Sequence, residues 1–221
     1  VVWGMEAGRL AAALGRQFAV AAVVGLCPVL AGMARADVGR LESLPCWGPA
    51  MEGVETRCYL LGVPENRTRP YDREIQLAVA ILLPEDTPDG GIPAPLVHLS
   101  GGPGWPTGLS GETFTFWQDW YAGWIGRQNR SLILVDQRGT GESEPRLQCD
   151  PAIAEPTERE YFKAPVPPDA RVHAAWLRYY MQACRRRFDA AGIDVAAYNT
   201  AESAADFAAL RRVLGLAEWD V

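Results

Sequence analysis

The sequence has little that could bind zinc or nucleic acid. It contains two histidines, His98 and His173, and none of its five cysteines form a Cys-x-x-Cys pair, so the spacing of a zinc site is missing. Acidic residues outnumber basic ones and the net charge is −6, which argues against a nucleic-acid partner. The one basic run, residues 185–187, falls late in a predicted helix, where positive charge stabilises the helix C-terminus. We expect no metal and no organic cofactor.

Long hydrophobic runs are confined to the N-terminal segment. Residues 18–33 are too short and too rich in Ala and Gly to span a bilayer core well. The run is preceded by two basic residues and followed by an A-x-A cleavage site; these are Arg9, Arg16 and Ala34-Arg35-Ala36, with Asp37 as the first mature residue. This order is typical of a secretory signal peptide, which we assign to residues 1–36.

Two points about this segment have alternative interpretations: where it starts, and whether it is cleaved. Met5 is a plausible start, so residues 1–4 are interpreted as upstream read-through. The alternatives to cleavage are a retained membrane anchor and a lipoprotein anchor on Cys27, which Leu26 disfavours because a small residue is expected there. We therefore predict an exported protein, periplasmic or secreted, that meets a membrane only during export. Residues 37–221 would form the N-terminal part of its mature domain.

Four cysteines remain after the signal segment: Cys46, Cys58, Cys149 and Cys184. An even number in an exported chain suggests two disulfides. The pairing Cys46–Cys58 with Cys149–Cys184 is favoured over the two others because short loops close at low entropic cost. Free buried thiols are the alternative.

Hydrophobic periodicity predicts alternating strands and helices. Strands are expected at residues 55–63, 74–83, 96–99 and 132–135, and residues 219–221 resemble the start of another strand. From this alternation we predict an α/β fold with a mostly parallel sheet and helices on both faces. Ligands of such sheets bind at the carboxyl ends of the strands.

Three helices are predicted between these strands. Residues 114–125 place aromatic side chains at a spacing of three to four, which favours an aromatic face in the core; a ligand-stacking role is the alternative. Residues 169–191 form a long helix with Cys184 on its inward face, as a disulfide requires. A last helix would be capped by Thr200 and end at Gly215.

Two loops at predicted strand ends carry unusual residues. Ser100-Gly101-Gly102-Pro103-Gly104 follows the strand at 96–99, and glycine lets a backbone N–H approach a ligand closely. Such an N–H could stabilise a developing oxyanion, whereas the alternative is a plain tight turn. The second loop, residues 136–143, contains Asp136 and Arg138, which could form an ion pair that holds it. We interpret this second loop as structural, since Gly139-x-Gly141 lacks the third glycine of a phosphate site.

The segments GGPG and ILVDQRGTGESEP resemble the proline iminopeptidase and tripeptidyl-aminopeptidase group of α/β-hydrolases. The resemblance extends to CYLLGVPENRTRPYDREIQLAVAIL and YNTAESAADFAALRRVLGLAEWDV, and covers nearly all of residues 46–221. It implies an α/β-hydrolase fold, an oxyanion N–H from Gly102 with Gly101 shaping the loop, and a Ser-His-Asp mechanism. In this group, residues like Trp219-Asp220-Val221 lead into a Gly-x-Ser-x-Gly elbow, and the acid, histidine and specificity-setting cap lie further downstream.

The 221 residues contain no Gly-x-Ser-x-Gly, so the chain is expected to be inactive alone and truncated before the elbow. Ser100, Ser110 and Ser143 are poor nucleophile candidates; the nearest match, around Ser110, ends in Glu112. We interpret His98 as a hydrogen-bonded core residue and His173 as a surface or interface residue. Two departures from the group, Ser100 for a common histidine and Trp105-Pro106 for small residues, bear on substrate preference.

The function expected from the resemblance is an exported peptidase acting on peptide N-termini. An esterase or lipase-like hydrolase using the same machinery, with a small ester or amide substrate, is an alternative. A non-catalytic binding protein is another. The oligomeric state is left open.

Overall fold

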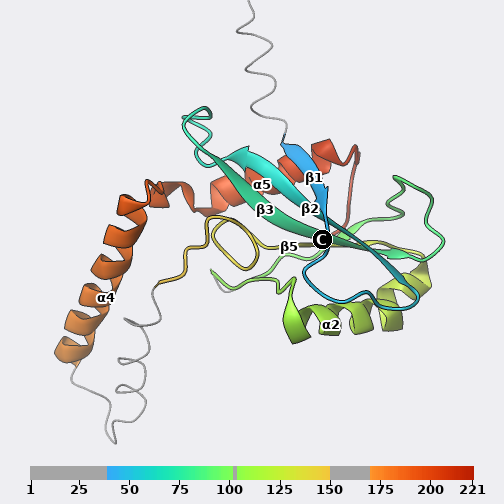
Figure 1. Ribbon diagram of the computed structural model, residues 1–221, viewed down its shortest axis with the longest axis horizontal. Helices are drawn as coiled ribbons and strands as arrows, with labels where there is room; N and C mark the ends of the chain where they lie inside the picture. The colour runs from blue at the N-terminus through green and yellow to red at the C-terminus, as the bar shows by residue number, and fades with distance from the viewer. Residues whose placement is uncertain (1–38, 102–103, 150–169) are drawn as a thin grey trace, which may run out of the picture.

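The computed structural model describes residues 39–101, 104–149 and 170–221. They contain a five-stranded sheet in the order β1-β2-β3-β5-β4 (Figure 1). The strands are β1 (Arg40–Leu44), β2 (Val54–Pro64), β3 (Glu74–Pro84), β4 (Leu96–Val97) and β5 (Leu132–Val135). The four predicted strands lie close to where periodicity places them, and β1 was not predicted.

The sheet is mixed, so the prediction of a mostly parallel α/β-hydrolase sheet is wrong. β1 with β2, β2 with β3, and β3 with β5 pair antiparallel, and β4 with β5 is the single parallel pair. The reason lies in the connections: β1, β2 and β3 follow one another without a helix between them, and short connections pair strands antiparallel. Only β4 and β5 are joined through helices, as a parallel crossover requires.

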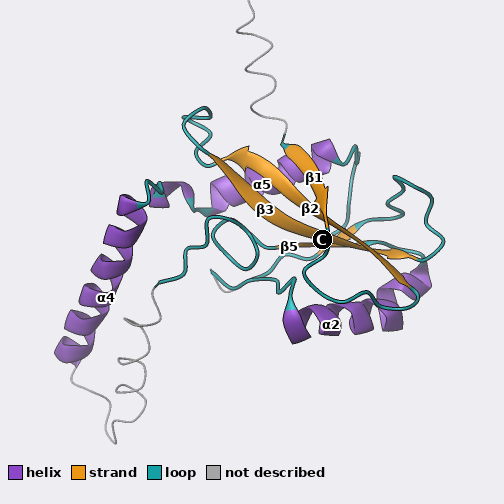
Figure 2. Cartoon of the chain, viewed as in Figure 1, coloured by secondary structure: helices purple, strands orange, loops and turns teal. Residues whose placement is uncertain are grey.

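Helices cover both faces of this sheet (Figure 2). On one face α5 (Thr200–Val213) packs Ala209 and Leu210 against alternate residues of β2, β3 and β5. On the other face α2 (Gly111–Trp120) and the π-helical turn η1 (Tyr121–Ile125) pack against the intervening residues. The period of two in the strands therefore places one hydrophobic core on each side of the sheet.

The predicted aromatic core face of the helix from residue 114 is only partly formed. The buried stripe consists of Phe114, Gln118, Tyr121 and Ile125, at successive spacings of four, three and four. Trp117 is half-buried against this core, whereas Phe116, Trp120 and Trp124 are 58%, 37% and 67% exposed. Gln118 occupies a core position because its Nε2 donates to the Pro49 carbonyl at 3.0 Å. Aromatic content alone did not indicate which side faced the sheet.

The long helix α4 (Ala170–Ala190) extends away from the sheet (Figure 1). Its C-terminal half buries Cys184 and Phe188 in a small cluster with Ile193. Asn199, not Thr200, caps α5, since its side chain accepts the Glu202 N–H at 3.0 Å.

Both predicted disulfides are confirmed. Cys46–Cys58 joins the segment after β1 to β2, and Cys149–Cys184 joins the chain beyond β5 to α4. The signal segment assigned to residues 1–36, with Cys27, lies outside the described residues. Within residues 39–101, 104–149 and 170–221, no helix combines the length and apolar character needed to cross a membrane.

Candidate functional site

The loops that follow β4 and β5 meet at one end of the sheet. Because these two strands are parallel, both chains leave the sheet in the same direction. An open cleft of about 540 Å³ lies between them. It is lined by residues of both loops and of the chain around the start of α5: Ser100, Gly101, Gly104, Trp105, Gln137, Arg138, Gly139, Thr140, Leu147, Tyr198, Asn199, Thr200 and Ser203. This is the carboxyl end of β4 and β5, where the sequence analysis predicts a ligand site.

The glycine-rich loop forms one wall of the cleft. Gly101 is exposed, and a Cβ added there would meet nothing within 4 Å. Gly104 has φ of +93°, in the region that favours glycine. Trp105 closes the loop and is 73% exposed, while Ser100 Oγ donates to its carbonyl at 3.4 Å. Gly102, the predicted oxyanion donor, lies outside the described residues with Pro103.

Asp136 links two segments of the chain next to this cleft. Its buried carboxylate accepts the N–H groups of Thr107 (2.7 Å), Gly108 (3.1 Å) and Glu142 (2.8 Å). Burial raises the pKa of Asp136, and the three backbone donors oppose that rise by stabilising the charged form. Asp136 therefore joins the segment before α2 to the loop after β5, which is a structural role.

Arg138 does not form the predicted ion pair with Asp136. Its guanidinium forks onto Asp206 of α5, with Nε–Oδ2 at 2.7 Å and a second nitrogen to Oδ1 at 2.8 Å. The remaining N–H groups donate to the carbonyls of Glu65, Ala197 and Pro64. The side chain is 1% exposed. The Arg138–Asp136 pair was predicted wrongly because the actual partner, Asp206, lies far from Arg138 in sequence. The Asp136 carboxylate instead accepts hydrogen bonds from backbone N–H groups close to it.

The Arg138 contact is part of a larger buried charge network. Arg67 also donates to Asp206, at 2.7 Å, and to Glu202. Beside it the Tyr198 hydroxyl donates to Glu65 at 2.9 Å. Burial, with Glu65 alongside, raises the pKa of Tyr198 well above its ordinary value. This network fixes α5 and the turn after β2 against the loop that lines the cleft.

The serines considered as nucleophiles have other roles here. Ser143 is buried, donates to the Asp136 carbonyl at 2.5 Å and accepts the Ala78 N–H at 2.9 Å. Ser110 donates to Glu142 at 2.7 Å. In the described part of the chain, no serine hydroxyl is hydrogen-bonded to a histidine. Ser143 and Ser110 are thus structural hydroxyls, and Ser100 is at the cleft wall without a base.

His98 is half-buried, and its ring forms no hydrogen bond with another described residue, so the predicted hydrogen-bonded core histidine is not seen in this part of the chain. Its ring packs against Trp117, with centroids 4.5 Å apart, and burial lowers its pKa. His173 belongs to α4, and its side chain is outside the described set. Within the described residues, no group of three metal-binding side chains is close enough to hold an ion.

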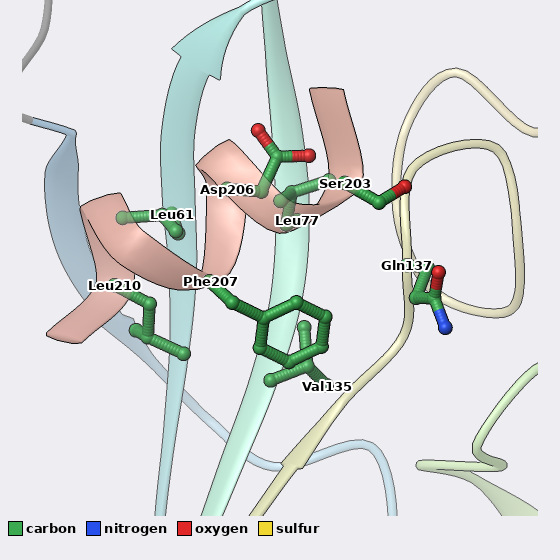
Figure 3. A pocket seen from close by; sticks show the side chains of 8 residues that line it. All are labelled: Leu61, Leu77, Val135, Gln137, Ser203, Asp206, Phe207 and Leu210. Carbon is green, nitrogen blue, oxygen red and sulfur yellow. The ribbon is translucent and has the colours of Figure 1, made fainter. Parts of the chain in front are cut away.

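A second cavity is too small to be a ligand site. About 10 Å³ remain between α5 and the sheet, lined chiefly by Leu61, Leu77, Val135, Phe207 and Leu210 (Figure 3). That volume holds at most about one water, and apolar cavities of this kind stay dry. It is a packing gap in the core.

Sequence reasoning missed the residue that links the two cleft loops. Gln137 Nε2 donates to the Ser100 carbonyl oxygen at 2.9 Å. Its position directly after Asp136, at the end of a buried strand, was the only sequence signal. Comparison with protein-family models finds no match for this chain, and no curated protein matches it either.

Proposed function

We propose that this chain provides the oxyanion-stabilising side of an exported serine peptidase that removes residues from peptide N-termini. The observation that carries the proposal is the glycine-rich loop after β4, which lines a 540 Å³ cleft and leaves Gly101 open to a ligand. The resemblance of this loop and of the segment 133–145 to the proline iminopeptidase and tripeptidyl-aminopeptidase group gives the reaction class. Gly101 and Gly102 are the proposed oxyanion-loop residues.

The chemistry assigned to these residues is electrostatic. As a nucleophile attacks a peptide carbonyl, negative charge develops on the carbonyl oxygen, and a fixed backbone N–H stabilises that charge without having to reorient. A side chain on the loop would obstruct this approach, which explains why glycine suits position 101. The 221 residues contain no Gly-x-Ser-x-Gly, so the proposed reaction requires a nucleophile that they do not supply.

Export is proposed on two grounds. The disulfides Cys46–Cys58 and Cys149–Cys184 would persist in an oxidising compartment but not in the reducing cytosol. Residues 1–36 have the order of a signal peptide. A substrate peptide would accordingly be met outside the cytosol.

The direct test is hydrolysis by the protein as its source cell makes it. Chromogenic di- and tripeptide amides with a free N-terminus should be cleaved, and the same peptides acetylated at the N-terminus should not. Cleavage of short esters with no cleavage of either peptide would identify an esterase instead. Tight peptide binding without turnover would identify a binding protein, and the peptidase proposal would be abandoned.

The 221-residue chain alone should cleave none of these substrates. Loss of triad members lowers kcat by about 10⁴–10⁶-fold, which places any residual rate below detection. The measurement is release of the chromophore by purified chain, with and without a serine-directed inhibitor. Turnover that the inhibitor abolishes would show that a nucleophile is present among these residues after all.

A further inference from the structure

Gln137 is joined to the peptide unit that carries the Gly101 N–H. Its Nε2 donates at 2.9 Å to the carbonyl oxygen of Ser100, and the Ser100 C=O and the Gly101 N–H belong to one planar peptide group. In a trans peptide these two bonds point in opposite directions. Fixing the oxygen toward Gln137 therefore fixes the Gly101 N–H on the far side.

Gln137 is itself held in place by hydrogen bonds of its own loop. Its carbonyl accepts both the N–H of Thr140 at 3.0 Å and the Thr140 hydroxyl at 2.8 Å. Arg138, the next residue, is anchored through the buried contacts to Asp206. Figure 3 shows the Gln137 amide turned away from the apolar side chains of the small cavity. The amide is thus free to act on the neighbouring loop.

The resemblance assigns the oxyanion N–H to Gly102, outside the described residues; the Gly101 N–H, at an exposed position in the cleft lining, is a second candidate donor. It donates to no other described residue, and the space where a Cβ would stand is open. A hydrogen bond accepted at the carbonyl of a peptide unit also polarises the unit and strengthens its N–H as a donor. Gln137 therefore acts on both the direction and the strength of this donor.

We propose that Gln137 is a positioning residue that orients the Ser100–Gly101 peptide toward the substrate carbonyl. This inference rests on the proposed function, since it assigns a role in that reaction. Gln137 touches no reacting atom. Its effect is on the barrier to reaction, because a misaligned donor stabilises the transition state less than a fixed one.

The first test uses the natural protein and does not depend on its activity. In Gln137→Leu, which keeps the bulk and removes the donor, the NMR order parameter of the Gly101 amide should fall from about 0.85 to below about 0.6. The matched control is Gln128→Leu, because Gln128 also donates from its side chain to a backbone oxygen, that of Trp124, at an exposed site. The control should leave Gly101 unchanged. An unchanged order parameter in Gln137→Leu would overturn the proposal.

The second test uses the natural protein. Gln137→Leu should lower kcat by about tenfold to a hundredfold while KM stays within about twofold, with an unchanged melting temperature. Gln137→Glu, which also lacks the donor, should behave like Gln137→Leu. A normal kcat in both, or a rise in KM alone, would overturn the positioning role. If the wild-type protein hydrolyses nothing, the proposed function fails and the catalytic part of this inference with it; the order parameter still decides whether Gln137 holds the loop.

Discussion

Replacing Arg138 with methionine is expected to lower the free energy of unfolding by about 3–5 kcal/mol. The guanidinium is almost fully buried and all its donors have acceptors, two of them on Asp206. Methionine fills similar space but removes the charge and leaves the carbonyls of Glu65 and Ala197 without their donors. Asp206 would keep Arg67 as a charged partner at 2.7 Å but lose both hydrogen bonds from Arg138, and weakening a buried ion pair in this way costs more than the pair contributes. Chemical denaturation of wild type and variant measures the difference.

The control for Arg138 is Arg185→Met. Arg185 pairs with Asp189 one turn along α4, and both side chains are at least half exposed, so its loss should cost only about 0.3–0.5 kcal/mol. Arg138→Met combined with Asp206→Asn should cost less than the sum of the two single losses, because both substitutions remove the same Arg138–Asp206 contact. A loss below about 1 kcal/mol for Arg138→Met would mean that the buried network is dispensable.

The second large effect is expected at Gly141. Its φ is +54°, and a Cβ there would lie 2.0 Å from Asp136 Oδ2, so alanine cannot be accommodated without moving the carboxylate. Moving it would break hydrogen bonds from three backbone N–H groups, one buried and two partly buried, and a buried N–H left unpaired costs about 1–3 kcal/mol. Gly141→Ala should therefore destabilise the chain by more than about 3 kcal/mol.

The variant Gly90→Ala separates the cost of a left-handed backbone from the cost of a steric clash. Gly90 has a φ of +74° but nothing within 4 Å of a Cβ, so alanine there should cost only the left-handed backbone, about 1–2 kcal/mol. Hydrogen exchange at Thr107, Gly108 and Glu142 should accelerate in Gly141→Ala and not in Gly90→Ala. Equal losses in the two variants would show that the Asp136 contact contributes nothing.

Local features of the fold were predictable from the sequence. Alternating and continuous apolar runs placed β2, β3 and β5, and the spacing of Leu210 and its neighbours placed α5 on the sheet. Loop length gave the disulfide pairing. The mostly parallel sheet was predicted wrongly, because the fold class was taken from the later alternation of strands and helices, whereas β1, β2 and β3 pair antiparallel. The sequence analysis also missed which side of α2 faces the core. Gln118 takes a core position there because it forms a hydrogen bond to Pro49.

The candidate site was predictable in its location and not in its contacts. A glycine-rich loop after a short apolar strand indicated where the cleft forms. The partners of Arg138 and Gln137 are 68 and 37 residues away in sequence, and no local pattern specifies such pairs. Asp136 and Arg138 are close in sequence and opposite in charge, yet they do not pair with each other. Asp136 accepts hydrogen bonds from backbone N–H groups, and Arg138 pairs with the buried Asp206.

The proposed function is tested most directly by mapping where a fluorophosphonate reacts. The natural protein should be labelled at one serine in a Gly-x-Ser-x-Gly sequence that does not occur among the 221 residues, and labelling should abolish hydrolysis of free-N-terminus peptides. Tandem mass spectrometry of the labelled digest locates the site, with heat-denatured protein as the control. Labelling at Ser100, Ser110 or Ser143, or no labelling of an otherwise folded protein, would contradict the proposal that these residues form one side of a serine peptidase.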